Sequence, residues 1–242
     1  MDLRPRTFAP PQRYTGVPSG RIILFMGAPG CGKGTQSAIL AGRSGMDCIS
    51  TGDILRQAAR ESTPQGLRLR EIMASGGLVD DVTVCDAVIS RIRVMERNSG
   101  GGLILDGFPR TVAQAKKLDR VLEALGIERP LVLHLDVPNE ILVQRLLKRR
   151  QCATCGRIYS TALDSLTRCE SDGGPLVERP DDNQDVVLKR LAAYEAETLP
   201  VLEYYRGRGQ QRYRRIDGCL TPAEIAKDVR EIVLFAGAPV AA

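Results

Sequence analysis

The 242-residue sequence has no tryptophan, and aromatic residues make up only 4% of the chain. Proteins that bind single-stranded nucleic acid stack bases on aromatic side chains, so this composition argues against that role. No apolar run approaches the roughly 20 residues that a membrane-spanning helix needs. Residues 1–20 contain four prolines and no apolar segment, which argues against a secretory signal and indicates a disordered tail. We therefore expect no nucleic-acid partner, no membrane and a cytoplasmic location.

A strong excess of one charge is also missing. Lysine and arginine number 34, aspartate and glutamate 29, and the net charge is +5. That excess suits an anionic ligand but is small for a nucleic-acid-binding surface. The seven cysteines, in a chain without a secretory signal, are more consistent with metal ligands or free thiols than with disulfides. Four of them are scattered, and we expect them to be small buried apolar side chains: Cys31, Cys48, Cys85 and Cys219.

What the sequence does contain is an alternation of strand-like and helix-like segments. Short apolar runs typical of buried parallel strands lie at Arg21–Gly27, Leu103–Asp106, Leu131–Val137 and Tyr213–Asp217. Segments of helical periodicity separate them. The last helix begins with Thr221, Pro222 and Glu224, the pattern of a capping box. The alternation predicts an α/β fold with a central parallel sheet.

Two stretches interrupt this alternation. Residues 50–79 have the pattern of a small helical insertion, and residues 149–182 are rich in Cys, Gly, Pro and charge. The predicted division is a core domain, two insertions and two tails. The core comprises residues 21–49, 80–148 and 183–235, and the tails are residues 1–20 and 236–242.

Residues 27–35, GAPGCGKGT, come close to the consensus of the phosphate-binding loop. The glycines let backbone N–H groups converge on a phosphate at a helix N-terminus, and Lys33 adds a mobile cation. The usual consensus places Ser or Thr after the lysine, where the hydroxyl binds Mg²⁺. Here that position is Gly34, and the hydroxyl follows at Thr35. The metal would then depend on phosphate oxygens and on waters oriented by carboxylates, and Asp106, which ends a strand, can supply one.

Three motifs occur in an informative order: GAPGCGKGTQ, ISTGDILR at Ile49–Arg56 and LDGFPRTVAQA at Leu105–Ala115, with RPDDN and LKRL downstream. The combination resembles the adenylate kinases over residues 21–235. In that family the loop regularly reads GKGT, so Gly34 marks a kinase that passes phosphate to another nucleotide. The resemblance implies a three-layer α/β/α P-loop fold and a monomeric, Mg²⁺-dependent enzyme that interconverts ATP and AMP with ADP. Residues 50–79 would bind the nucleoside monophosphate, and residues 149–182 would form a lid over ATP.

Transfer between two nucleotides brings together anions that repel each other, and the planar guanidinium group of arginine suits them. By resemblance, the catalytic residues are Lys33, Asp106, Arg110, Arg145, Arg149, Arg179 and Arg190. The expected ATP-binding residues are Gly27, Gly30, Cys31, Gly32, Lys33, Gly34, Thr35, Arg149, Ile158 and Tyr159. The expected AMP-binding residues are Thr51, Arg56, Leu78, Val79, Gly107, Arg110, Gln114, Arg179 and Arg190.

Some of these residues have more specific roles by the same resemblance. Gln114, one helical turn after Arg110, would read the adenine edge by hydrogen bonding. Asp53 would join Asp106 in ordering the waters of Mg²⁺. Thr51 would line the AMP pocket, a role compatible with its capping the helix that follows.

Three further residues complete the expectations for the site. Asp181 and Asp182, in RPDDN, resemble acids at the base of the lid that order nearby arginines such as Arg145 and Arg149. No general base is required, because the attacking phosphate oxygen of AMP is already ionised. His134, the only histidine, lies inside an apolar run and is expected to be a core residue.

The cysteines of the second insertion are grouped. Two close pairs across a loop are the spacing of a structural zinc ribbon, and the four side chains are Cys152, Cys155, Cys169 and Asp172. Aspartate is an acceptable Zn²⁺ ligand, and many zinc-bearing adenylate kinases use three cysteines and an aspartate. Four protein ligands leave no open position, so the expected metal is structural. The loop is shorter than is usual in the family, and Asp164 or Glu170 could replace Asp172.

Two alternatives stay open at this point. A GTP:AMP phosphotransferase or another nucleoside monophosphate kinase would keep the chemistry and change a substrate. Thr51 and Gln114 favour AMP as the acceptor, whereas the sequence does not indicate the base of the nucleoside triphosphate that donates the phosphoryl group. A non-catalytic P-loop switch or a nucleic-acid-binding zinc ribbon belongs to a different class of protein. A switch would more naturally keep the hydroxyl that Gly34 lacks, and a nucleic-acid binder needs an exposed basic patch.

Overall fold

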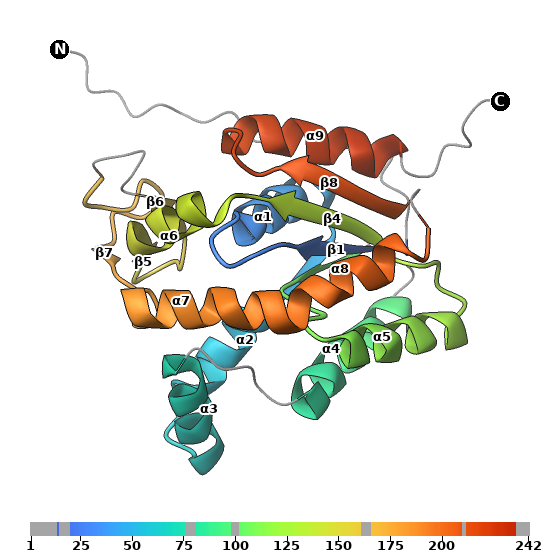
Figure 1. Cartoon of the computed structure of the whole chain (residues 1–242), viewed down its shortest axis with the longest axis horizontal. Helices are drawn as coiled ribbons and strands as arrows, with labels where there is room; N and C mark the ends of the chain where they lie inside the picture. Colours follow the sequence, from blue (N-terminus) through green and yellow to red (C-terminus); the bar gives the residue numbers. More distant parts are fainter. Residues whose placement is uncertain are drawn as a thin grey trace.

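The computed structural model describes residue 14 and residues 20–75, 81–97, 102–160, 166–209 and 212–235. Its centre is a sheet of five strands in the order β2-β3-β1-β4-β8 (Figure 1). Every pairing in this sheet is parallel. The predicted α/β fold with a central parallel sheet is confirmed. The strands are β1 (Ile22–Met26), β2 (Asp47–Ser50), β3 (Leu103–Asp106), β4 (Leu131–Asp136) and β8 (Tyr213–Asp217).

Four of the five strands lie where apolar runs predict them. The sequence pattern did not indicate β2, which has only four residues and carries polar side chains at both ends. Within the described part of the chain, β2 is at the edge of the sheet and pairs with β3 alone, with Ile49 opposite Leu105. An edge strand buries less surface than a central one, so its sequence carries a weaker signal.

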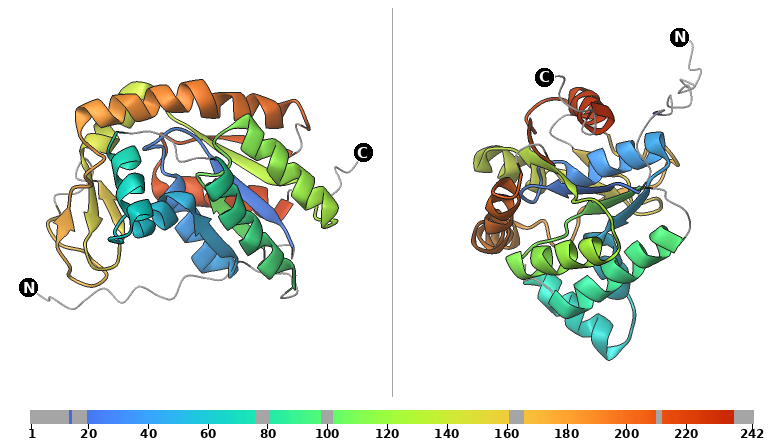
Figure 2. Two further views of the ribbon diagram at one scale, coloured as in Figure 1. Left: turned by 90° about the horizontal axis from the view of Figure 1, so that it is seen from below. Right: turned by 90° about the vertical axis from the view of Figure 1, so that its right-hand side faces the viewer.

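Helices cover both faces of the sheet (Figure 2). In β1, Ile22, Leu24 and Met26 belong to one core, whereas Ile23 and Phe25 belong to the other, as the two-residue period of a strand requires. The first core is closed by α4 (Asp81–Arg97), α5 (Val112–Ala124) and α8 (Leu199–Arg206). The second is closed by α1 (Lys33–Ser44), α6 (Asn139–Leu147), α7 (Gln184–Ala193) and α9 (Pro222–Phe235).

The two stretches that interrupt the alternation contain helices and strands that lie largely outside the central sheet. Residues 50–79 contain α2 (Thr51–Ala58) and α3 (Pro64–Ala74). Residues 149–182 contain an antiparallel sheet in the order β6-β5-β7. Both lie at the same end of the molecule, toward which the carboxyl ends of the central strands point (Figures 1 and 2). The small sheet is built of β5 (Arg149–Cys152), β6 (Ile158–Ser160) and β7 (Leu176–Val177).

The start of α9 and the junction of α7 with α8 show how local sequence shapes the helices. The capping box of α9 is present: Thr221 N donates to Glu224 Oε2 at 2.9 Å, and Glu224 N donates to Thr221 Oγ1 at 3.3 Å. Between α7 and α8 the helix widens into the π-helical turn η1 (Tyr194–Thr198), which the sequence did not indicate. Within the described ranges, no helix is long and apolar enough to cross a membrane.

The expectation for the scattered cysteines is confirmed for two residues and wrong for two. Cys31 and Cys85 are buried, but Cys48 and Cys219 are exposed. Cys48 lies on β2, the edge strand of the sheet that the described residues form. Cys219 lies in the turn after β8, where its N–H donates to Asp217 Oδ1 at 2.8 Å. In both places the backbone position keeps a small apolar side chain out of the core.

His134 is a core residue, as predicted, and it makes the stability depend on pH. It is 7% exposed on β4, and its Nδ1 lies 2.7 Å from Tyr213 Oη. Burial lowers the pKa of His134 to about 4, from 6.5. The unfolded chain therefore binds this proton more readily, so stability is retained above pH 6.5 and falls as the pH drops toward 4.

We expect the free energy of unfolding to fall by about 1 kcal/mol between pH 7.5 and pH 5.5 through this one group. Urea denaturation of the wild type and of His134→Gln at both pH values measures it. His134→Gln serves as the control, because it has the same carboxylates as the wild type and lacks only the imidazole of His134. An equal loss of stability in both proteins would show that His134 is not the source.

Candidate active site

The loop between β1 and α1 has the conformation that its glycines predict. Gly27, Gly30 and Gly32 have φ angles of 137°, 87° and 103°. Gly32 is the N-cap of α1 and offers no side-chain acceptor to the first N–H groups of the helix, which leaves those donors for an anion. Lys33 Nζ lies over the loop and donates to the carbonyl oxygens of Gly27, at 2.6 Å, and Ala28, at 2.9 Å. Backbone dipoles and a cation are thus combined in one loop.

A carboxylate lies beside the position where the usual consensus has a hydroxyl. A Cβ atom added to Gly34 would lie 3.4 Å from Asp106 Oδ2. Burial raises the pKa of Asp106 and nearby Asp53 adds to this, while Lys33 acts in the opposite direction. Oxygen ligands next to a phosphate-binding loop fit the preference of Mg²⁺, which usually keeps several waters. Thr35, which carries the displaced hydroxyl, is exposed on the first turn of α1.

Asp53 faces the same region from α2. Its carboxylate forms an ion pair with Arg56, one turn further along the helix. Burial raises the pKa of Asp53, but the hydrogen bond and charge of Arg56 outweigh this and lower it overall. Asp53 and Asp106 are close enough to influence each other, so the two carboxylates expected to order Mg²⁺-bound waters do lie near each other.

The end of β3 and the start of α2 are joined through Gly107. Its carbonyl oxygen accepts from Thr51 Oγ1 at 2.9 Å and from Arg110 Nε at 3.0 Å. The residue that caps α2 is Ser50, whose hydroxyl oxygen accepts from Asp53 N at 3.3 Å. The interpretation of Thr51 as the N-cap is therefore wrong. Thr51 is the first helical residue, and its buried hydroxyl is turned toward Gly107 instead.

Gln114 lies at the centre of a polar network on α5. Its Oε1 accepts from Arg110 N at 2.7 Å, and its Nε2 donates to Asp81 Oδ1 at 2.6 Å. The other oxygen of Asp81 accepts from Thr111 Oγ1 at 2.7 Å. Sequence reasoning missed Asp81, because an acidic residue at the start of a helix is common and carries no functional signal. The two expected AMP-site residues before it, Leu78 and Val79, lie outside the described residues.

Asp182 orients two of the expected arginines. This carboxylate is 8% exposed and accepts two bonds from Arg149, one of them from Nε at 2.6 Å. Arg190 Nη1 lies 3.1 Å from Asp182 Oδ1 and 3.0 Å from Asp181 Oδ2. Paired charge-assisted bonds fix the guanidinium planes. Arg145, the other suggested partner of these acids, donates instead to Gly218 O at 2.8 Å.

The remaining arginines gather at the same place. Burial, together with the charges of Arg149 and Arg56, lowers the pKa of Arg179 to about 10. Burial also lowers the pKa of Arg110, helped by Arg190 and opposed by Asp106. Positive charges held this close repel one another unless an anion lies among them. The arginine cluster is drawn from α2, the segment after β3, strand β5, the segment between β7 and α7, and α7 itself. It comprises Arg56, Arg110, Arg149, Arg179 and Arg190.

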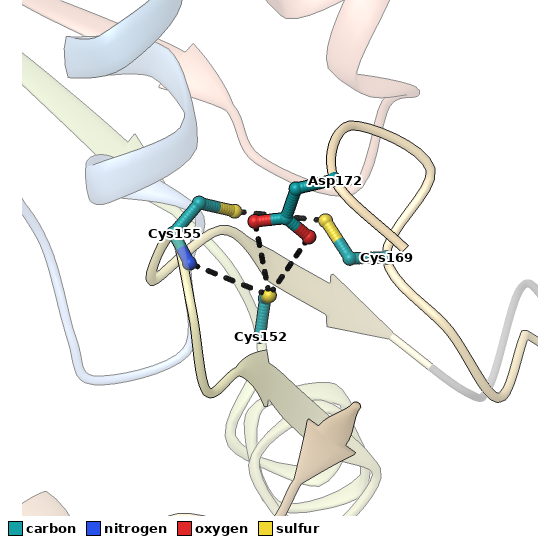
Figure 3. Close-up of side chains that lie close together, drawn as sticks. All are labelled: Cys152, Cys155, Cys169 and Asp172. Atoms are coloured by element: carbon teal, nitrogen blue, oxygen red, sulfur yellow. Dashed lines mark hydrogen bonds between the residues drawn. The ribbon is translucent and has the colours of Figure 1, made fainter. Parts of the chain in front are cut away.

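Cys152, Cys155, Cys169 and Asp172 come together at the small sheet, and each offers one ligand atom within 4.8 Å of the others (Figure 3). Cys155 Sγ lies 3.5 Å from Cys169 Sγ, and Cys152 Sγ lies 3.3 Å from Asp172 Oδ1. Ligands about 2.0–2.3 Å from a tetrahedral Zn²⁺ are spaced in this range. The four residues therefore fit a structural zinc ion. Of the two alternative carboxylates, Glu170 is outside this group, and Asp164 is outside the described residues.

Tyr159 and Ile158, expected to contact ATP, lie on β6. The side chain of Tyr159 is 9% exposed and turned toward the cysteines. Its hydroxyl lies 3.2 Å from Cys169 Sγ and accepts from Glu170 N at 3.0 Å. Hydrogen bonds of this kind hold metal ligands in place. Any contact of Tyr159 with a nucleotide would therefore involve its backbone.

Comparison with known proteins decides the family. The family model described as adenylate kinase matches residues 25–210. The chain belongs to the adenylate kinase family. It is 40% identical over 223 residues to an adenylate kinase of Gloeobacter violaceus, covering 88% of this chain and 98% of that one. An adenylate kinase of Symbiobacterium thermophilum is 40% identical over 215 residues, covering 87% and 97%, and one of a Geobacter species is 41% identical over 210 residues, covering 86% and 96%.

The resemblance expected from the sequence motifs is thus confirmed. Asp106 connects the loop at Gly27–Thr35 with the arginine cluster electrostatically, since the charges of Lys33 and of Arg110 both act to lower its pKa.

Proposed function

We infer that the protein is an adenylate kinase that transfers the terminal phosphoryl group of ATP to AMP, reversibly, and yields two ADP. The observation that carries this inference is the convergence of five arginines from separate stretches of sequence, of which Arg56 and Arg110 lie near Asp106, as Lys33 of the loop does. Transfer between two polyanions depends on positioning and on electrostatic stabilisation of the transferring group. The alternative in which GTP is the phosphoryl donor in place of ATP is not favoured.

On the acceptor side, we propose that Arg56 and Arg110 bind the AMP phosphate and that Gln114 reads the adenine edge. Arg110 is suited to this because its backbone is held at both ends. Its N–H donates to Gln114 Oε1 at 2.7 Å, and its carbonyl oxygen accepts from Thr198 Oγ1 at 2.9 Å. Thr198 belongs to the π-helical turn, so an irregularity in the helix supports the phosphate-binding arginine.

On the donor side, the glycines of the loop, Lys33 and the backbone around Cys31 would hold the ATP phosphates. Arg149, Arg179 and Arg190 would stabilise negative charge on the phosphoryl group during transfer. Bound with ATP, Mg²⁺ would neutralise charge on the phosphate oxygens, and Asp106 and Asp53 would orient its waters. No side chain need act as a base, since the attacking phosphate oxygen is ionised.

We further propose that residues 149–182 form a lid stapled by one zinc ion, with Cys152, Cys155, Cys169 and Asp172 as ligands. Closure of this segment over ATP would exclude water, which would otherwise divert transfer into hydrolysis. The division into core, nucleoside-monophosphate insertion and lid belongs to the same proposal. We also propose that the protein is monomeric and cytoplasmic. Light scattering would measure its molar mass in solution and so test whether it is a monomer.

A coupled assay for ADP formation tests the function. With ATP as donor and AMP, GMP, CMP and UMP as acceptors, we expect activity with AMP at least tenfold above the others. With AMP as acceptor, we expect ATP to be used at least as well as GTP. A tenfold preference for GTP would overturn the donor assignment. Tight RNA binding without ADP formation would overturn the proposed function.

A further inference from the structure

Two groups hold the side-chain amide of Gln114 by hydrogen bonds: one of them can only donate, and the other can only accept. The backbone N–H of Arg110 can only donate, and it faces Gln114 Oε1 at 2.7 Å. The carboxylate of Asp81 can only accept, and it faces Gln114 Nε2 at 2.6 Å. Gln114 is 3% exposed, so water does not compete for these bonds. A flipped amide would place oxygen against a carboxylate and N–H against N–H, two mismatches at once.

A fixed amide presents a fixed hydrogen-bonding pattern. One lone pair of Oε1 and one hydrogen of Nε2 remain after these two bonds. Together they match a purine with a ring acceptor and an exocyclic amino group, which is adenine. A 6-oxopurine reverses both positions, with a ring N–H and a carbonyl oxygen, and it would match only the flipped amide. The orientation of Gln114 therefore decides which purine monophosphate fits.

We propose that Asp81 is a specificity-determining positioning residue: it fixes the amide orientation of Gln114 and thereby makes the acceptor site select a 6-aminopurine over a 6-oxopurine. This rests on the proposed function, in which Gln114 reads the acceptor base. Asp81 need not touch the nucleotide, because it acts through Gln114. Its second oxygen, bonded to Thr111 Oγ1 at 2.7 Å, anchors the carboxylate to the cap of α5.

The substitution Asp81→Asn tests this with a side chain of the same shape. Asparagine can turn its own amide and donate to Gln114 Oε1, so the flip then costs one mismatch instead of two. We expect the ratio of kcat/KM for AMP to kcat/KM for IMP, with ATP as donor, to fall by about tenfold or more. The KM for AMP should rise while the KM for ATP stays unchanged. IMP is the appropriate probe, because it differs from AMP only at the two positions in question.

Three variants separate this role from a structural one. Asp86→Asn makes the same change on the exposed face of α4, where Asp86 pairs with Lys117, and should leave the ratio unchanged. Thr111→Val removes the cap of α5 and the bond to Asp81 Oδ2, but it leaves an acceptor-only carboxylate facing Gln114 Nε2, so it should lower the melting temperature and change the ratio by no more than a few-fold. Asp81→Glu keeps an acceptor-only carboxylate and should preserve selectivity within a few-fold.

The outcomes distinguish this inference from the function on which it rests. If the wild type forms no ADP from ATP and AMP, the proposed function fails. If the wild type prefers AMP and the AMP:IMP ratio of Asp81→Asn is unchanged, the inference fails alone. Equal losses of kcat/KM with AMP and IMP would show that Asp81 only supports the fold, which also overturns it.

Discussion

The variant Arg110→Lys is expected to lose about three orders of magnitude in kcat/KM, because Arg110 is proposed to hold the attacking phosphate of AMP and loss of an arginine at the reacting phosphates costs about this much in other phosphoryl-transfer enzymes. Arg110 is held through both its backbone and its side chain. Gln114 and Thr198 hold its backbone, and its Nε donates to Gly107 O at 3.0 Å. Lysine keeps the charge but has neither the planar fork nor an Nε donor to Gly107. The loss should therefore appear even though the net charge of the site is unchanged.

A steady-state assay of ADP formation at saturating ATP measures this effect. Arg120→Lys is the matched control, since Arg120 lies exposed on α5 ten residues along and makes none of these contacts. We expect the control to retain full activity and both variants to keep the wild-type melting temperature within a few degrees. Activity of Arg110→Lys above a tenth of the wild-type value would mean that the guanidinium group of Arg110 does not contact the reacting phosphates.

The parts of this site that could be predicted from sequence are those with a local motif. The loop at Gly27–Thr35 encodes its own conformation through glycine, and the cysteine spacing predicts the four groups that converge at Cys152, Cys155, Cys169 and Asp172. Each motif spans few residues, or two short pairs across one loop. Their geometry therefore follows from chain connectivity.

What could not be predicted depends on contacts between distant segments. Asp81 meets Gln114 from 33 residues away, and Thr198 meets Arg110 from 88 residues away. Neither Asp81 nor Thr198 lies in a sequence motif that predicts which residue it contacts. The side-chain direction of Tyr159 was missed for a related reason, because packing of β6 against the cysteines decides it. Ser50 and Thr51 are adjacent residues that could each cap α2. Gly107, which follows β3, accepts a hydrogen bond from Thr51 Oγ1, and Ser50 is the residue that caps the helix.

Removal of zinc is expected to destabilise residues 149–182 far more than the rest of the molecule. Among the residues that the structure describes in this segment, the small core contains Cys152, Tyr159 and Cys169 as buried residues, with Leu166 and Leu176 packed against them. A core of this size cannot hold a segment of some 30 residues without a metal or disulfide. Chelation should therefore open the small sheet to protease, and the cleavage sites should fall between β5 and α7.

Metal analysis of the purified protein should give one zinc ion per chain, and Cys152→Ser should lower this below a tenth. Cys48→Ser and Cys219→Ser are the matched controls, because both cysteines are exposed and lie outside the group of four ligands. Tyr159→Phe removes only the hydroxyl at 3.2 Å from Cys169 Sγ and should weaken zinc retention about 10-fold to 100-fold. The cooperative melting of the five-stranded sheet should survive chelation, since its two cores contain none of the four ligands. A zinc-free protein whose lid resists protease as the wild type does would show that the four side chains hold the segment together without metal.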